Sequence, residues 1–204
     1  MKFLLGKKLN MTQVFGEDGT VYPVTVIEST PIKVTQIKTN ERDGYSSVQV
    51  GFGSRKSKNI NKSVKGHTKD LGNFEILKEF RVEENLPTLG DEISLDVLKE
   101  GDVVEISGIT KGKGFQGVVK RHGFKGGPRS HGQKHSEREP GSIGGAGRDG
   151  GRVAKGKRMA GRTGGDRVTV KNLKIVQIDK DNNQIYISGA VPGRRGTILE
   201  IRSK

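Results

Sequence analysis

Glycine and positive charge are concentrated in one stretch of this chain, residues 111–167. The stretch holds 17 of the 31 glycines, and its 15 lysines and arginines against four acidic residues give it a net charge of +11. The other 147 residues carry 22 basic and 19 acidic side chains, a net charge of +3. Only this second part has the composition of an ordinary globular domain.

The basic stretch has too few apolar residues to form a core of its own. Only ten of its 57 residues are apolar, and burying them cannot offset the conformational entropy lost when so long a backbone is fixed. Glycine lets a backbone pass close to phosphates or through a narrow channel. We therefore predict that this stretch becomes ordered on a polyanionic partner.

Outside this stretch the sequence predicts short β-strands. Runs of β-branched residues with partial alternation, bounded by glycine, proline and Asp-Gly turns, are typical of strands. The runs cover residues 21–28, 33–39, 47–52, 74–82, 92–98, 102–107, 167–178 and 184–188. Residues 179–183 join the last two as a hairpin, and a weaker helical pattern begins at residue 60. The pattern favours a mainly β protein, with a small barrel that the basic stretch interrupts.

These patterns predict a body and an extension. The body comprises residues 1–110 and 167–204 and forms the β-barrel, with residues 55–98 as a small α/β insertion. The extension comprises residues 111–166. Because it lies between strands of the body, it leaves the barrel and returns to it.

The overall charge restricts the class of partner. The chain carries 37 basic and 23 acidic residues, a net charge of +14, and such a balance favours a polyanion such as nucleic acid or an anionic membrane. No apolar run approaches the roughly 18 residues of a spanning helix, and the first apolar residues are too few for a signal peptide. Cysteine is absent, which excludes disulfides, thiolate zinc sites and a cysteine nucleophile. We expect a soluble, cytoplasmic protein without a membrane partner.

Residues 112–117 match the dinucleotide-binding spacing G-x-G-x-x-G and precede a possible short helix at 118–122. The adjoining strands lack the helices of a βαβ unit, and the acidic residue expected about 20 positions later would be Glu137, which lies in a basic loop. The pattern therefore favours a glycine and lysine turn that meets phosphate. A nucleotide-dependent enzyme remains the less favoured alternative.

Three histidines, His122, His131 and His135, lie in the basic stretch, but no carboxylate or thiol completes a usual metal set. Hydrogen bonding to RNA or stacking on it is the favoured role. Ser130 and Ser136 lie near these histidines in the sequence and could suggest a serine nucleophile with a histidine base. No acidic residue is identified that would orient the histidine, so the pattern does not indicate a catalytic triad. We predict no catalytic residue, no metal, no cofactor and no small-molecule substrate.

Basic side chains interspersed with glycine in this stretch indicate RNA binding, rather than a charged surface that only contacts solvent. Arginine offers a planar fork for phosphates and bases, whereas lysine acts as a point charge. The predicted RNA-binding residues are Lys111, Lys113, Lys120, Arg121, Lys125, Arg129, His131, Lys134, His135, Arg138, Arg148, Arg152, Lys155, Lys157, Arg158, Arg162 and Arg167.

Several long motifs resemble one family. They are SGITKGKGFQGVVKRHGF at 107–124, SHG at 130–132, PGSIG at 140–144, KGKRMAG at 155–161 and RVTV at 167–170. GKKLNMTQVF at 6–15, PVTVI at 23–27, DGYSSVQVGF at 43–52 and GAVPG at 189–193 extend the match. In order and over nearly the whole chain, they resemble the bacterial form of the universal L-three family, the third protein of the large ribosomal subunit.

The resemblance implies a six-stranded barrel of the translation-protein type and a long extension that penetrates large-subunit ribosomal RNA towards the peptidyl transferase centre. It implies direct RNA binding early in assembly, with neighbouring large-subunit proteins as further partners. Residues 111–121 would form the root of the extension, 140–157 would lie near its tip, and 155–161 on its returning limb. A free nucleic-acid chaperone, which would bind duplexes without a fixed site, is the third hypothesis.

Overall fold

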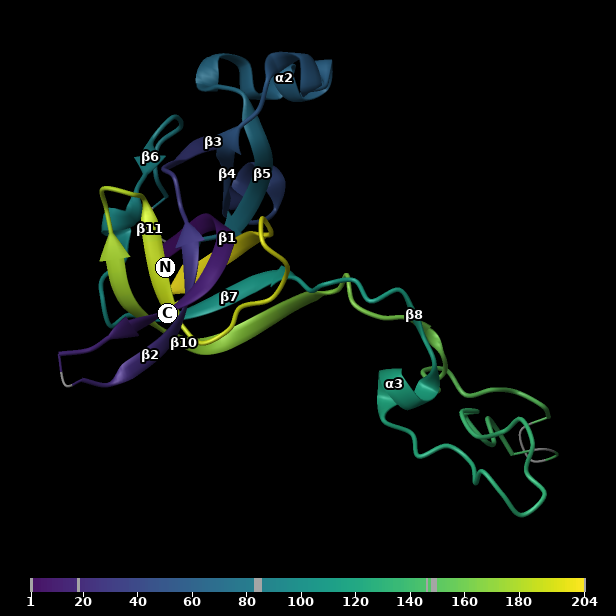
Figure 1. Ribbon diagram of the computed structural model, residues 1–204. Helices are drawn as coiled ribbons and strands as arrows, with labels where there is room; N and C mark the ends of the chain where they lie inside the picture. The colour runs from purple at the N-terminus through teal and green to yellow at the C-terminus, as the bar shows by residue number, and fades with distance from the viewer. Residues whose placement is uncertain (1, 18, 83–85, 146, 148–149, 204) are drawn as a thin grey trace. The chain divides into compact units, whose positions relative to one another are not determined.

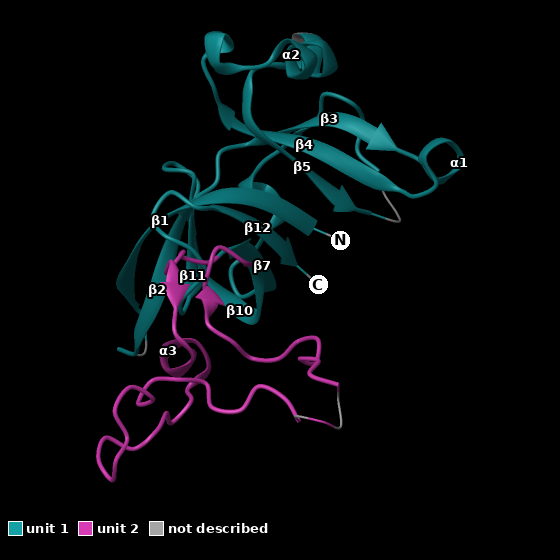
Figure 2. Cartoon of the chain, turned by 90° about the vertical axis from the view of Figure 1, so that its right-hand side faces the viewer, with its two compact units in different colours: residues 1–109, 167–204 teal, residues 110–166 magenta. Residues whose placement is uncertain are grey.

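The computed structural model describes residues 2–17, 19–82, 86–145, 147 and 150–203. The chain divides into two compact units, residues 1–109 with 167–204 and residues 110–166 (Figure 2). The second unit comprises the extension and Thr110.

Six antiparallel strands of the first unit close into a barrel (Figure 1). In their order around the barrel they are β1 (Lys2–Phe15), β12 (Ile198–Ser203), β7 (Val103–Ile109), β10 (Arg167–Asp179), β11 (Gln184–Ser188) and β2 (Val21–Glu28). Each neighbouring pair is antiparallel. The prediction of a mainly β fold with a six-stranded barrel is confirmed.

The barrel is closed around aliphatic side chains that alternate along its strands. Ile185 and Ile187 of β11 and Leu199 and Ile201 of β12 have no exposed surface. Alternation of this kind places every second side chain inside a small barrel, which the side chains fill. The first unit therefore has the hydrophobic core that the extension lacks in its sequence.

A second sheet of the first unit has the order β5 (Phe74–Arg81), β4 (Ser47–Ser54), β3 (Ile32–Lys38) and β6 (Glu92–Ile93). Short helical segments accompany it: α1 (Asn40–Asp43), η1 (Ser57–Asn59), α2 (Lys62–Thr68) and η2 (Lys69–Leu71). The sheet shares one core cluster with the barrel, and the rings of Phe3 and Phe80 stack at 4.4 Å between centroids. Because β3 and β4 belong to it, this sheet begins well before the insertion expected at 55–98.

Two strand predictions need correction. Of the strand predicted at 92–98, only Glu92–Ile93 is β-structure, and Leu95–Val97 forms the 3₁₀ turn η3. Leu95 and Leu98 are both buried, because residues three apart lie on one side of such a turn. The two outer strands of the sequence, β1 and β12, were not predicted, although they pair with each other along six residues. No helix among the residues that the structure describes is long and apolar enough to span a membrane.

Candidate nucleic-acid interface

The extension starts and ends at neighbouring strands. Ile109 at the end of β7 pairs with Arg167 at the start of β10. Beyond this pair the two limbs stay bonded to each other, because the Thr110 amide donates to the Asp166 carbonyl at 2.9 Å and the Lys113 amide to the Thr163 carbonyl at 2.8 Å. A short ladder of β8 (Phe115–Gln116) and β9 (Gly161–Arg162) follows. The outgoing and returning limbs thus form a narrow antiparallel ribbon.

Two glycines permit backbone approaches that no other residue would allow. A Cβ at Gly164 would lie 2.1 Å from the carbonyl oxygen of Lys111, and φ is +75°. A Cβ at Gly126 would lie 2.0 Å from the carbonyl oxygen of Glu137, and φ is +79°. Both positions combine a left-handed backbone with the close approach of another backbone segment of the extension. Some glycines of the extension are therefore needed for its own backbone conformation, whether or not a partner is bound.

Helix α3 (Val118–His122) holds the returning limb. It lies at the residues predicted for a helix and ends at Gly123, whose φ of 71° is left-handed. Val118 is the only buried hydrophobic residue among the described residues of this unit. The Arg121 guanidinium donates to the Met159 carbonyl at 2.9 Å, and Nε2 of His122 lies 3.1 Å from the same oxygen. Polar contacts rather than a core fix this part of the extension.

The predicted RNA-binding residues are displayed to solvent. Of the 17, Arg148 lies outside the described residues, and each of the other 16 is exposed. Fifteen of those 16 belong to the second unit, and Arg167 begins β10 of the first.

Four of the arginines already have partners within the chain. Arg121 binds Met159 as above, and Arg129 pairs with Glu137 at 2.7 Å. The Arg158 guanidinium lies 5.1 Å from the centroid of the Phe124 ring. Arg167 binds the carboxylate of Glu200. These side chains contribute to the shape of the protein, and any contact with a ligand would add to that role.

Ten other cations have no hydrogen bond, ion pair or ring contact within the part of the chain that is described. They are Lys111, Lys113, Lys120, Lys125, Lys134, Arg138, Arg152, Lys155, Lys157 and Arg162. We call them the free cations. Because nothing in the described chain neutralises them, they are the groups best suited to release counterions from a phosphate backbone.

Glu200 gathers three cations at the surface of the first unit. Its carboxylate binds Arg167, lies 3.1 Å from Nζ of Lys78 and 4.0 Å from the Arg202 guanidinium. Burial alone would raise the pKa of the Glu200 carboxyl, but the hydrogen bonds from Arg167 and Lys78 outweigh it and hold that pKa below its ordinary value. The ionised cluster anchors the start of β10, so Arg167 has a structural role that its sequence position did not reveal.

The glycine motif at 112–117 does not lie in a dinucleotide-binding fold. The strands on either side of it, β7 and β10, are antiparallel neighbours, whereas the βαβ unit needs parallel strands joined by a helix. Helix α3 has only five residues. Among the residues described, no three histidine, aspartate or glutamate side chains come together as a metal site, and His131 and His135 are both exposed.

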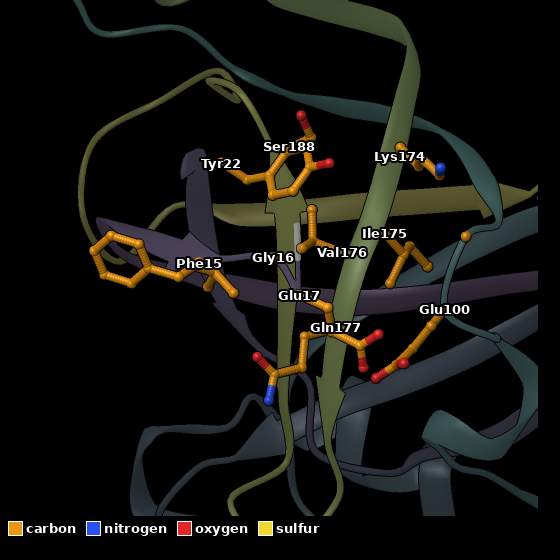
Figure 3. Close-up of a pocket in the computed structure, with 12 residues that line it drawn as sticks. Phe15, Gly16, Glu17, Tyr22, Glu100, Lys174, Ile175, Val176, Gln177 and Ser188 are labelled. Carbon is orange, nitrogen blue, oxygen red and sulfur yellow. The ribbon is translucent and has the colours of Figure 1, made fainter. Parts of the chain in front are cut away.

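A pocket of about 490 Å³ opens on the barrel beside the β1–β2 hairpin (Figure 3). Phe15 and Tyr22 lie on one side of it, and the carboxylates of Glu17 and Glu100 extend toward each other on another. Glu100 accepts a hydrogen bond from the Ile178 amide at 3.0 Å, so it holds a backbone group of β10. Two acids against one lysine in the lining make this pocket unsuited to a phosphate.

A second group of exposed cations was missed by the sequence analysis. It lies at residues 55–69, in the connection between β4 and β5. A count of charge in shorter windows would have found it, because six basic residues occur there without an acidic one.

Comparison with known proteins identifies relatives over nearly the whole chain. The family model described as Ribosomal protein L3 matches residues 88–186. The large ribosomal subunit protein uL3 of Finegoldia magna is 49% identical over 205 residues, which cover 99% of this chain and 97% of that protein. The uL3 proteins of Syntrophobacter fumaroxidans and Nocardia farcinica are each 48% identical, over 99% and 98% of this chain and 97% and 91% of theirs. The chain therefore belongs to the uL3 family of large ribosomal subunit proteins.

Proposed function

We propose that this chain is a structural constituent of the large ribosomal subunit that binds large-subunit ribosomal RNA directly through residues 111–166. The observation that carries the proposal is the set of ten free cations on a unit with a single buried hydrophobic residue in its described part. Such a segment has no packed interior to stabilise and a large electrostatic affinity for RNA. The family consists of structural ribosomal proteins and not of enzymes.

The free cations are the primary contacts in this proposal. Lysines meet phosphates as point charges, while Arg138, Arg152 and Arg162 bind phosphates in a bidentate manner or stack on unpaired bases. His131 and His135 are exposed and add hydrogen bonds or stacking. Arg121, Arg129, Arg158 and Arg167 act secondarily, because each already has a partner. Arg148 is assigned to the interface by its sequence alone.

The proposal extends to assembly and to the peptidyl transferase centre. Electrostatic steering speeds association with exposed RNA. We therefore propose that the protein binds early and helps to initiate subunit assembly. The stretch 144–151 is almost bare backbone in sequence, so it can enter a crowded RNA interior where larger side chains would clash. We place it near the peptidyl transferase centre, where it supports the surrounding RNA and takes no part in the chemistry. The protein would work in the cytoplasm among neighbouring large-subunit proteins.

Limited proteolysis tests the RNA interface. Trypsin should cut the isolated chain first between residues 111 and 167, because exposed lysines and arginines lie there on a backbone with little packing. A large-subunit ribosomal RNA fragment should protect these sites. The barrel serves as the internal control, since cleavage in β10 should be slow in both states. Equal cleavage of the extension with and without RNA would contradict the proposal.

A further inference from the structure

The connection between β4 and β5 is far longer than the sheet needs. Ser54 and Phe74 are paired across the two strands, and the Arg55 amide donates to the Asn73 carbonyl at 3.0 Å. Two residues suffice to join antiparallel neighbours, yet residues 55–73 intervene here. Long connections of this kind in a compact domain usually carry a function.

Residues 55–69, which we call the basic connection, dominate the charge of the first unit. They include six lysines and arginines and no acidic residue. The remaining 132 residues outside 111–167 carry 16 basic and 19 acidic side chains, a net charge of −3. The positive charge of the body therefore comes from the basic connection alone. A random scatter of surface lysines does not account for such a concentration.

The structure directs these cations outward. Lys62 and Lys65 lie one turn apart on α2, while Thr68 is buried and its hydroxyl donates to the Val64 carbonyl at 3.0 Å. Each of the six basic side chains is exposed, and none has an ion pair with a described acidic side chain. Figure 2 shows α2 in the connection between β4 and β5, and the exposed side chains of this connection are open to solvent.

A hollow of about 490 Å³ lies beside α2. Its lining includes Arg42, His67 and Lys69 with residues of β3 and Leu89, and none of its described lining residues is a carboxylate. His67 is held in place, because its Nε2 lies 2.7 Å from Oε1 of Gln49, which also accepts the Thr35 hydroxyl at 3.0 Å. Lys69 takes a positive φ of 43° that is uncommon for a residue with a side chain. Three basic residues beside this hollow suit a phosphate.

We propose that the basic connection and Arg42 form a second RNA-binding surface, separate in sequence from the extension and carried by the body. Lys58, Lys62 and Lys65 contact successive phosphates of one RNA strand, and the hollow lined by Arg42, His67 and Lys69 holds a further phosphate. This inference rests on the proposed function, because it assigns a second contact to the same RNA partner. RNA is favoured over an acidic protein because the cations lie along an exposed connection with few apolar neighbours.

The test compares two full-length variants that lose equal charge. K58Q/K62Q/K65Q removes three cations of the basic connection. The control K99Q/K171Q/K174Q removes three exposed lysines on β10 and just before β7, of which Lys171 pairs with Glu105. The first variant should bind large-subunit ribosomal RNA about tenfold to fiftyfold more weakly near about 0.2 M salt, with a salt slope smaller by about 2 to 3. The control variant should bind like wild type. Thermal unfolding of both variants verifies that the fold is intact.

A proximity measurement identifies the partner. The chain has no cysteine, so Ser63→Cys gives a single site on α2 for a tethered hydroxyl-radical source. Strand cleavage of ribosomal RNA in reconstituted large subunits is the expected result, with Thr20→Cys on the β1–β2 hairpin for comparison. The inference is overturned if the radical source at position 63 cleaves no RNA and cleaves a neighbouring acidic protein instead.

The two proposals fail in distinguishable ways. If wild-type protein does not bind the RNA, the proposed function itself is wrong. If wild type binds and K58Q/K62Q/K65Q matches the barrel control in affinity and slope, only the second surface is wrong.

Discussion

Replacing five free lysines of the extension with glutamine should weaken binding to large-subunit ribosomal RNA by about 10²- to 10³-fold near about 0.2 M salt. The five are Lys111, Lys113, Lys120, Lys155 and Lys157, each exposed and without a partner in the described chain. If the ten free cations each neutralise one phosphate, the wild-type slope of log affinity against log salt is about −7 to −9. Loss of five should bring it to about −3 to −5.

The control for this variant removes the same charge from exposed positions of the first unit, at Lys2, Lys99, Lys171, Lys174 and Lys180. Lys2, Lys171 and Lys180 have ion-pair partners, so thermal unfolding of the control must show that its fold is intact. Binding isotherms at several salt concentrations give both the affinity and the slope. The account requires the two variants to differ, because it places the phosphate contacts on the extension. If equal losses of charge have equal effects, binding depends on net charge alone and the free cations have no special role.

Deleting residues 142–153 should impair late maturation of the large subunit and its response to inhibitors of peptide-bond formation, while early RNA binding persists. The free cations at 111–138 and 155–162 remain in this variant and keep most of the electrostatic affinity. Purified large subunits with the shortened protein should be assayed for its incorporation, puromycin reactivity and antibiotic binding.

A matched variant replaces residues 142–153 with a glycine and serine linker of equal length, which separates loss of the tip's sequence from loss of its length. Wild-type values of all three properties in the deletion variant would show that the tip is not near the peptidyl transferase centre. Complete loss of puromycin reactivity in otherwise intact subunits would indicate a direct catalytic role, which the account denies.

Local patterns predicted the elements whose signal is strong in the sequence. The alternating β-branched run at 21–28 and the hairpin ending in 184–188 coincide with β2 and β11. Helix α3 also has its predicted bounds of 118–122, because glycine stands on both sides of a short apolar start. The concentration of charge and glycine likewise indicated the segment that the structure separates as residues 110–166.

Features that depend on distant partners could not be predicted in this way. In β1, Gly6, Lys7 and Lys8 interrupt the alternation of apolar and polar residues that marks a strand in a sequence. This segment becomes a strand because it pairs with β12, almost 200 positions later. The engagement of Arg167 by Glu200 likewise joins residues far apart in sequence. Composition does not distinguish the extension's cations from one another, whereas their contacts in the described chain divide them into ten free side chains and three with partners.

Sedimentation at high salt tests the central claim most directly. Cell extract should be centrifuged through a sucrose gradient at about 0.5 M salt, and the protein detected across the fractions. A constituent held by many phosphate contacts and by the ribbon of 110–166 within folded RNA should remain with the large subunit, since this salt removes proteins bound only at the surface. Recovery of the protein at the top of the gradient, free of the large subunit, would contradict the account.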